Sequence, residues 1–593
     1  MMLSPSPTLD ATTSAAGFLL VLSIVIPIGG ILLAFVLGDR YVRLVAFAVI
    51  PIGLAVTVSI LIALPQSNGP LVYLLGAWPP PLGIALRADG LSAVMLAAAA
   101  AVICAVAVFA AADFSPTKTE TRAPFAFWIL LLAIWGALNT IFLGGDLFTL
   151  YVALELLTFA AVPLVSLEGR AETLRAALRY LLFALLGSLL YLLGTALLYG
   201  LHGTLDIVLL SRLVGTEPAA LVAAALMTTG LLAKTALFPL HLWLPSAHAG
   251  APSAASAILS GLVVKGSFFI VVRLWFNVMP GLPGFAATQL LAALGGAAIV
   301  FGSVVALRQE RLKLLIAYST LAQIGYLFLM FPLALGASGK LESGGALAGG
   351  LLQAVSHATA KAAMFLAAGS IYAALGQDRI PRLGGAGRIV PVSVLAFALG
   401  GLALMGLPPG GAYLAKELLL QAAAEQGQWW WAVVLQAGGM FTAAYVLLVL
   451  TYAMAPADKQ ATPGSTAPRM AELAAIALAL CSLLLGLVPW DAYLSMPHGH
   501  ASATLGLAAL SKALVPLLGG AVVAILIGRW EPAPGHPSRW KALLAAADPI
   551  RRTALASSAV FEKGDNALRQ WPAACICLLS LAALFAASMW AGL

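Results

Sequence analysis

Four lysines lie inside long apolar segments of this 593-residue sequence: Lys234, Lys265, Lys361 and Lys416. A charged side chain at the centre of a bilayer costs a few kcal/mol or more, so such residues are rare unless they serve a function. Burial disfavours the charged form of an amine, which lets a buried lysine exchange its proton. The four lysines therefore predict proton-carrying groups rather than surface charges.

Other titratable residues accompany these lysines in the apolar segments. Glu155 is the only acid in its segment, and His357 lies four residues before Lys361, on the same face of a helix. Glu417 directly follows Lys416. Because five basic or titratable groups face only two acids, static ion pairing would leave ammonium groups unpaired. We therefore expect a proton relay near the middle of a membrane, formed by Glu155, Lys234, Lys265, His357, Lys361, Lys416 and Glu417.

The composition indicates that the chain lies in a membrane. The chain is 62% hydrophobic and only 9% charged, which leaves too little polar surface for a soluble protein of this length. Apolar runs of about 20 residues recur along the whole chain, and each can cross a bilayer as a helix. The predicted fold is an all-α polytopic membrane protein. Its predicted spans are 15–37, 43–64, 91–112, 124–142, 147–166, 176–201, 219–242, 252–276, 286–307, 312–333, 345–374, 390–418, 429–452, 470–489, 503–527 and 571–592.

The distribution of positive charge predicts the orientation. Loops after odd-numbered spans hold most of the 31 lysines and arginines, so the positive-inside rule places those loops in the cytoplasm. We expect an integral protein of the bacterial inner membrane with both termini in the periplasm. The net charge of +8 follows from this bias and requires no nucleic-acid partner.

Prolines break two of the spans, one shortly after Lys234 and one shortly before Lys416. Broken helices at membrane depth are tolerated where the backbone lines a polar cavity, so the prolines are expected to let water approach the lysines. Paired broken spans indicate an inverted repeat with its site at the midplane. The supporting residues at the breaks are Pro239, His241, His248, Pro408 and Pro409.

The spans divide the chain into four parts. Three spans occupy 1–123, five occupy 124–276, five more occupy 286–452, and the C-terminal spans occupy 470–593. Because five is odd, the two five-span units would have opposite topology. The segment 528–570 is basic and mildly amphipathic, and we expect a cytoplasmic linker there, with room for a helix on the lipid surface.

Several chemistries have no signature in the sequence. There is no Walker A motif, dinucleotide fingerprint, haem motif or cysteine cluster. We therefore expect no catalytic residue for redox or hydrolytic chemistry, no cofactor and no metal. The four cysteines, Cys104, Cys481, Cys575 and Cys577, are expected to pack as inert thiols.

The motifs that hold the titratable residues resemble a known family. They include LLAKTALFPLHLWLPSAHAGAPSAASAILSGLVVKGSFFIVVRLW (231–275), RLKLLIAYSTLAQIGY (311–326), SHATAKAAMFLAAGSIY (356–372) and GLPPGGAYLAKELLL (406–420). The chain resembles the antiporter-like subunits of the complex I and Mrp (multisubunit cation/proton antiporter) superfamily over about 70–460.

The resemblance implies a 14-helix core with two inverted five-helix repeats and broken seventh and twelfth helices, followed here by about two further spans. It implies a Glu155–Lys234 pair, central relay groups at Lys265, His357 and Lys361, and an exit-side Lys416. Some members carry a histidine where this chain has Gln353, so the route between the halves is expected to differ in detail.

Three function classes follow. The first is a proton-translocating subunit of a redox-driven complex, such as an NADH dehydrogenase or a membrane hydrogenase. The second is a subunit of a gradient-driven Mrp-type Na⁺/H⁺ antiporter, and the third is a non-transporting scaffold subunit. In each class the expected partners are other membrane subunits, and in the first two the transported ion is the proton, with Na⁺ possible in the second.

Overall fold

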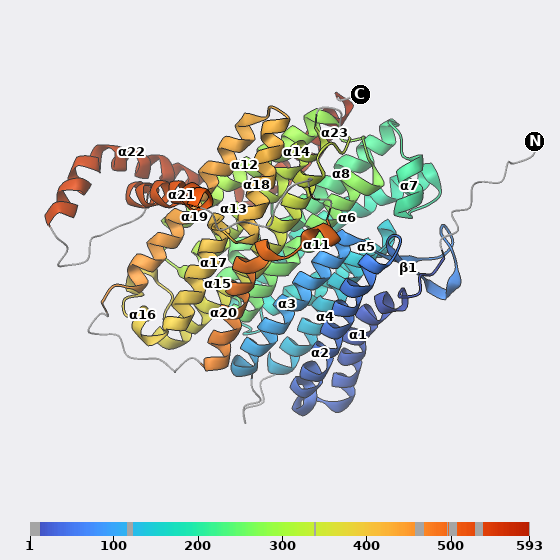
Figure 1. The fold of residues 1–593 in the computed structure, drawn as a ribbon, viewed down its shortest axis with the longest axis horizontal. Helices are drawn as coiled ribbons and strands as arrows, with labels where there is room; N and C mark the ends of the chain where they lie inside the picture. The colour runs from blue at the N-terminus through green and yellow to red at the C-terminus, as the bar shows by residue number, and fades with distance from the viewer. Residues whose placement is uncertain are drawn as a thin grey trace, which may run out of the picture.

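The computed structural model describes residues 12–114, 123–336, 340–456, 468–494, 496, 507–527 and 538–591. The described part holds 14 helices that are long and apolar enough to cross a membrane. Two further predicted spans account for the rest of the expected count. One is broken into two short helices, and the other is α21 (Leu507–Ile527). Figure 1 shows most of these helices running side by side in one bundle.

The helices follow the predicted order. The N-terminal part contains α1 (Phe18–Leu37), α2 (Asp39–Ala63), β1 (Leu71–Leu74), β2 (Ala85–Ala88) and α3 (Gly90–Asp113). The next part contains α4 (Ala123–Leu143), α5 (Leu147–Val165), α6 (Ala171–His202), α7 (Ile207–Leu213), α8 (Pro218–Thr235), α9 (Leu244–Gly250), α10 (Ser253–Ile258) and α11 (Val264–Arg273), with two π-helical segments at Leu259–Val263 and Leu274–Val278. The antiparallel hairpin of β1 and β2 was not predicted.

The second half has the same kind of organisation. It contains α12 (Gly284–Arg308), α13 (Leu312–Phe328), α14 (Met330–Leu335), α15 (Gly344–Leu375), α16 (Ala386–Ile389), α17 (Pro391–Met405), α18 (Gly411–Glu425) and α19 (Trp429–Ala453). The C-terminal part contains α20 (Arg469–Leu484), α21, α22 (Ser538–Leu568) and α23 (Trp571–Trp590).

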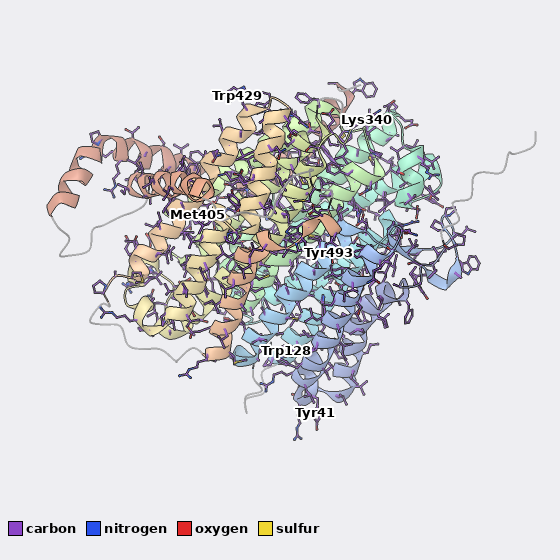
Figure 2. The ribbon with its side chains drawn as sticks, in the orientation of Figure 1. Tyr41, Trp128, Lys340, Met405, Trp429 and Tyr493 are labelled. Atoms are coloured by element: carbon purple, nitrogen blue, oxygen red, sulfur yellow. The ribbon has the colours of Figure 1, made fainter. Side chains whose placement is uncertain are left out.

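The two ends of the bundle alternate along the chain as the charge pattern predicts. Tyr41 lies in the first predicted cytoplasmic loop and Trp128 shortly after the second, whereas Lys340 lies in a predicted external loop and Trp429 directly after another. Figure 2 places the first two residues at one end of the bundle and the other two at the opposite end.

The first helix break has a defined turn geometry. Helix α8 ends at Thr235, and Ala236 adopts a left-handed conformation with φ of 60°. The N–H of Leu237 then donates to the carbonyl of Leu232 at 3.1 Å, and the N–H of Leu240 donates to the carbonyl of Leu237 at 2.7 Å. This is a Schellman-type end, which satisfies carbonyls that the broken helix would otherwise leave free.

The second break repeats this geometry. Helix α17 ends at Met405, and Gly406 has φ of 84°. The N–H of Leu407 donates to the carbonyl of Leu402 at 3.3 Å, and the N–H of Gly410 donates to the carbonyl of Leu407 at 2.8 Å. A proline stands three residues after the left-handed position in both turns, as Pro239 and Pro409. The predicted correspondence of the two broken helices is therefore visible in their hydrogen bonds.

Small residues bring α6 close to α8. A Cβ added at Gly187 would lie 2.6 Å from the carbonyl oxygen of Gly230, and one added at Gly230 would lie 2.2 Å from the carbonyl oxygen of Gly187. Only glycine permits this approach, which is a common way of packing helices in membranes. The close approach places Ser188 of α6 beside Lys234 near the end of α8.

The segment expected as a linker at 528–570 contains the 31-residue helix α22. Helix α21 packs on α19, α22 contacts α12, and α23 packs on α8 and α12. The C-terminal part therefore crosses from the second half of the core to the first. Figure 1 shows α21 and α22 at the outer edge of the bundle and the C-terminus beside α23.

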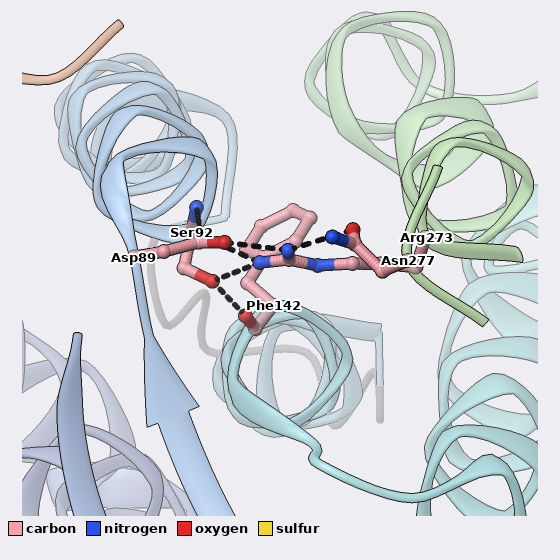
Figure 3. A network of polar contacts seen from close by, with 5 residues as sticks. All are labelled: Asp89, Ser92, Phe142, Arg273 and Asn277. Atoms are coloured by element: carbon pink, nitrogen blue, oxygen red, sulfur yellow. Dashed lines mark hydrogen bonds and ion pairs between the residues drawn. The ribbon is translucent and has the colours of Figure 1, made fainter. Parts of the chain in front are cut away.

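A network around Arg273 joins the N-terminal helices to the first repeat (Figure 3). The guanidinium donates to both carboxylate oxygens of Asp89 at 2.6 Å and to Ser92 Oγ at 2.9 Å. Ser92 in turn donates to the carbonyl of Phe142 at 2.6 Å. Asp89 is also the N-cap of α3, where it accepts from the N–H of Ser92. One ion pair thus fixes α3, α4 and α11 relative to one another.

We predict that this ion pair makes the stability depend on acid pH. Burial raises the pKa of Asp89, but the charge and hydrogen bonds of Arg273 lower it more, so the pKa lies below its ordinary value of 3.8. A lowered pKa contributes stability that is present above the unfolded pKa and is lost as the pH falls through the folded one. Asp89→Asn keeps the helix cap and removes the charge. Thermal unfolding in detergent should show wild type ahead by about 1 kcal/mol at pH 7, and this advantage should shrink as the pH falls below about 4 and be lost below the folded pKa.

The control is Asp39→Asn, which removes an exposed carboxylate at the start of α2. Its unfolding temperature should equal that of wild type at every pH. An Asp89→Asn variant that unfolds at the wild-type temperature at pH 7 would show that the pair does not hold these helices together.

Candidate functional site

Lys234 and Glu155 form an ion pair inside the first repeat. The Nζ atom of Lys234 lies 3.0 Å from Glu155 Oε1, and the two side chains are only 6% and 15% exposed. Lys234 also donates to Ser188 Oγ and, at 3.5 Å, to the carbonyl of Leu154. The predicted pair is therefore present in the structure, and α5, α6 and α8 each contribute a partner.

A cavity of about 10 Å³ lies beside Lys234, lined also by Thr158, Tyr180 and Ser267. This is close to the smallest volume that holds one water molecule. On the neighbouring helix turn, Thr235 Oγ1 donates to Ser267 Oγ at 2.9 Å and connects α8 to α11. Polar groups thus continue from the ion pair toward the centre of the bundle.

Lys265 lies at the centre and is fully buried. Its Nζ donates to the carbonyl of Ser260 at 2.5 Å. Ser260 belongs to the π-helical segment that precedes α11, where the wider turn interrupts the regular α-helical pairing. The hydroxyl of Ser260 lies 2.8 Å from that of Thr320 on α13, so the first repeat contacts the second through two hydroxyl groups.

Lys361 continues this polar line in the second repeat. It is fully buried, its Nζ donates to Ser319 Oγ at 2.5 Å, and it lies 5.6 Å from the centre of the Tyr445 ring. Ser319 is the sequence neighbour of Thr320, so adjacent residues of α13 contact Lys361 and the Ser260 hydroxyl. No acid is bonded to Lys265 or Lys361 in the described part of the chain, and their partners are neutral oxygens.

Two glutamines extend the line from Lys361 toward Lys416. Gln323 donates to Thr442 Oγ1 at 3.0 Å and to Tyr445 at 3.4 Å, and Gln353 donates to Gln323 Oε1 at 2.9 Å. Gln353 also lines a second cavity of about 10 Å³ together with Lys416. The departure noted at Gln353 therefore has a structural counterpart, because its amide lies between Gln323 and the cavity at Lys416.

The three predicted site histidines differ in their surroundings. Both ring nitrogens of His357 and of His248 are buried without a hydrogen-bond partner among the described residues. The His248 ring stacks on Phe365 with centroids 4.7 Å apart. His357 is buried in α15 one helix turn before Lys361, which places it in the central group.

His241 instead contacts the C-terminal helix. Its Nε2 lies 3.1 Å from Asp565 Oδ1 of α22, and Asp565 also accepts from the Tyr318 hydroxyl at 2.5 Å and pairs with Arg569 at 2.9 Å. Burial raises the pKa of Asp565, but the hydrogen bond from His241 and the charge of Arg569 lower it more, below its ordinary value. The C-terminal segment thus places a carboxylate against the loop that follows the break in α8.

The structure buries Lys234, Lys265 and Lys361 and pairs Lys234 with Glu155, while Lys416 lines a small cavity with Gln353 and precedes Glu417 in the same helix. Pro239, Pro408 and Pro409 lie in the two turns that break the helices. Sequence reasoning missed the neutral connectors, which are Ser188, Ser260, Ser319, Thr320, Gln323, Thr442 and Tyr445. Ser, Thr and Gln are common in membrane helices, so their types alone gave no signal. Among the described residues no group of three or more His, Cys, Asp or Glu is arranged to hold a metal ion.

Comparison with known proteins identifies relatives over most of the chain. A family described as "NADH:quinone oxidoreductase/Mrp antiporter, TM" matches residues 144–442. The chain is 32% identical to NADH-quinone oxidoreductase subunit N of Desulforudis audaxviator, over 76% of this chain and 88% of that protein. It is 31% identical to an Na(+)/H(+) antiporter subunit of Alkalihalophilus pseudofirmus, over 73% of this chain and 86% of that protein.

A similar solved structure is a chain of the Mrp complex from Dietzia sp. DQ12-45-1b. Its TM-score is 0.72 at 24% identity, and the match covers 86% of this chain and 97% of the other. At this identity the likeness concerns the fold. Together with the sequence relatives, it confirms the resemblance that the motifs indicate.

Proposed function

Because this chain belongs to the NADH:quinone oxidoreductase/Mrp antiporter family of proton-conducting membrane subunits, we propose that protons cross it along the buried line from Glu155 and Lys234 through Lys265, Lys361 and His357 to Lys416. The observation that carries the proposal is the contact between the two repeats. There, Lys265 donates to the carbonyl of Ser260, the Ser260 hydroxyl lies 2.8 Å from that of Thr320, and the next residue of α13, Ser319, accepts from Lys361.

Neutral hydroxyl groups suit this role. A serine or threonine hydroxyl accepts a hydrogen bond from an ammonium group, and after rotation it donates one to a neutral amine. The Lys361 site, whose partner is the Ser319 hydroxyl, can therefore hold either protonation state with a hydrogen-bond partner. A carboxylate in the same place would favour the ammonium form and hold the proton there.

Electrostatic repulsion supplies a direction for the transfer. Two ammonium groups about 7 Å apart repel by about 2 kcal/mol at an effective dielectric constant near 20, so loading one lysine disfavours loading its neighbour. Movement of Glu155 away from Lys234 would remove the attraction that holds the proton there. The proton would then pass inward to Lys265, and onward past His357 to Lys361 and the glutamines beside Lys416.

The driving force has to come from outside this chain, and we propose other membrane subunits as its partners. A redox-driven assembly fits the similarity to NADH-quinone oxidoreductase subunit N. A gradient-driven antiporter with Na⁺ as the exchanged ion fits the similarity to the Na(+)/H(+) antiporter subunit of Alkalihalophilus pseudofirmus and to a chain of an Mrp complex. The same buried line serves both, and the genes adjacent to the one for this chain would distinguish them.

We predict that Lys265→Met stops proton transport but not proton entry. Methionine keeps the length of the side chain and removes its charge. In proteoliposomes that contain the assembled complex, steady-state transport should fall to the level of empty liposomes. Rapid-mixing measurements should still detect proton uptake at the Glu155–Lys234 end, because that pair is untouched.

The matched control is Lys340→Met, which removes a lysine from a predicted external loop and should transport normally. Wild-type transport by Lys265→Met at normal expression would show that protons do not pass through Lys265. Loss of both uptake and transport would place this residue at the entrance rather than at the centre.

We also propose that the chain lies in a bacterial inner membrane with both termini on the periplasmic side. Single cysteines added at either end of a cysteine-free variant should react with an impermeant thiol reagent from the periplasm. A cysteine at position 340 should react in the same way, and one at position 388 only from the cytoplasm. A C-terminal cysteine that reacts only from the cytoplasm would mean that the number of crossings is odd.

A further inference from the structure

A half-open cavity of about 320 Å³ lies at one end of the bundle, apart from the buried line. It is formed by the first turns of α6, the short helix α9, the start of α13 and the residue that follows α22. Its volume is in the range of small-molecule sites. By the charge distribution this is the cytoplasmic end. We call this cavity the basic cavity.

The lining of the basic cavity carries a large excess of positive charge. Four arginines line it, Arg175, Arg179, Arg311 and Arg569, and the only acid in the lining is Glu172. Positive charges that face one cavity repel one another, which is unfavourable unless water or an anion occupies the cavity.

Two of the arginines are already neutralised from outside the cavity. Arg311 pairs with Asp378 at 3.1 Å, and Arg569 pairs with Asp565 at 2.9 Å. Even so, the Nε atom of Arg569 is buried without a hydrogen-bond partner. A buried donor of this kind is costly to leave unsatisfied, so it indicates that a further acceptor is missing.

The other two arginines have no partner of their own. Neither Arg175 nor Arg179 forms an ion pair or a side-chain hydrogen bond within the described part of the chain. Arg179 is partly buried and experiences the like charge of Arg569. An anion between these guanidinium groups would turn this repulsion into attraction.

We propose that the basic cavity binds a phosphate group of an anionic ligand. The planar fork of arginine matches two phosphate oxygens, which makes arginine a preferred residue for this group. Helices α6 and α13 both begin at the cavity, and the positive ends of their dipoles add to the attraction. Basic pockets between helices at the membrane surface are suited to phospholipid headgroups, and soluble phosphate has the same chemistry.

The test measures thermal unfolding of the full chain in a neutral detergent. The probes are dioctanoyl phosphatidylglycerol, the zwitterionic dioctanoyl phosphatidylcholine and inorganic phosphate. A ligand that binds only the folded state raises the unfolding temperature, by about 1–2 °C for a chain of this size when the ligand concentration is about 10 to 100 times its Kd. Because the readout is unfolding and not transport, its outcome is independent of the proposed proton route.

The key variant is Arg175→Gln combined with Arg179→Gln. Its control is Arg40→Gln combined with Arg388→Gln, which removes the same charge from arginines outside the basic cavity. We expect phosphatidylglycerol to stabilise wild type and the control equally, and the key variant by less than half as much. If the double variant does not fold, Arg175→Gln alone replaces it, because Arg175 is exposed. This single variant should also reduce the rise in unfolding temperature that phosphatidylglycerol causes.

The probes distinguish the source of the phosphate. Stabilisation by phosphatidylglycerol but not by inorganic phosphate supports a lipid headgroup, and stabilisation by inorganic phosphate that is lost in the key variant supports a soluble anion. An equal rise in unfolding temperature in the key variant and in the control would overturn the proposal. So would the absence of a shift with both anionic probes, or a shift with phosphatidylcholine as large as that with phosphatidylglycerol.

Discussion

The structure depends on one constraint, which is that an amine inside a helical bundle needs polar partners that the surrounding apolar side chains cannot provide. Lys265 and Lys361 are fully buried, and each has a single short hydrogen bond to a neutral oxygen. Lys234, at the break in α8, is instead paired with Glu155. The partner is thus a carboxylate at Lys234, a backbone carbonyl at Lys265 and a hydroxyl at Lys361. The proposed proton line rests on this change from a charged partner to neutral ones.

The helix breaks and the close helix contacts serve the same constraint. The two Schellman-type ends satisfy backbone carbonyls at membrane depth, where an unsatisfied carbonyl is costly. The contact of Gly187 with Gly230 brings Ser188 to Lys234, and the π-helical segment presents the carbonyl of Ser260 to Lys265. The C-terminal helix adds Asp565 to this arrangement from outside the two repeats.

Much of this arrangement could be predicted from the sequence. Lysine in an apolar segment is a strong signal because its burial is costly, and this signal identified Lys234, Lys265, Lys361 and Lys416. The broken helices were predictable because an interior proline removes a backbone hydrogen bond and clashes with the preceding turn, which kinks or breaks a helix. The α-helical spans followed from apolar length alone.

The remaining features depend on tertiary contacts. Ser319 and Gln323 look like any polar residues of a membrane helix until α13 is placed between the two repeats. The Asp565–His241 contact joins residues 324 positions apart, and no local pattern indicates it. The basic cavity was hidden for the same reason, because its arginines come from three separate segments that were each interpreted as positive loop charge.

The most direct test of the buried line is proton transport by Ser319→Ala, since this change removes only the hydroxyl that connects Lys361 to α13. The control is Ser370→Ala, which removes a buried hydroxyl of α15 that has no hydrogen-bond partner among the described residues. If protons follow the buried line, Ser319→Ala in the assembled complex at normal expression should take up protons at the Glu155–Lys234 end but not deliver them across the membrane, whereas Ser370→Ala should transport normally. Wild-type transport by Ser319→Ala would show that protons do not pass this hydroxyl.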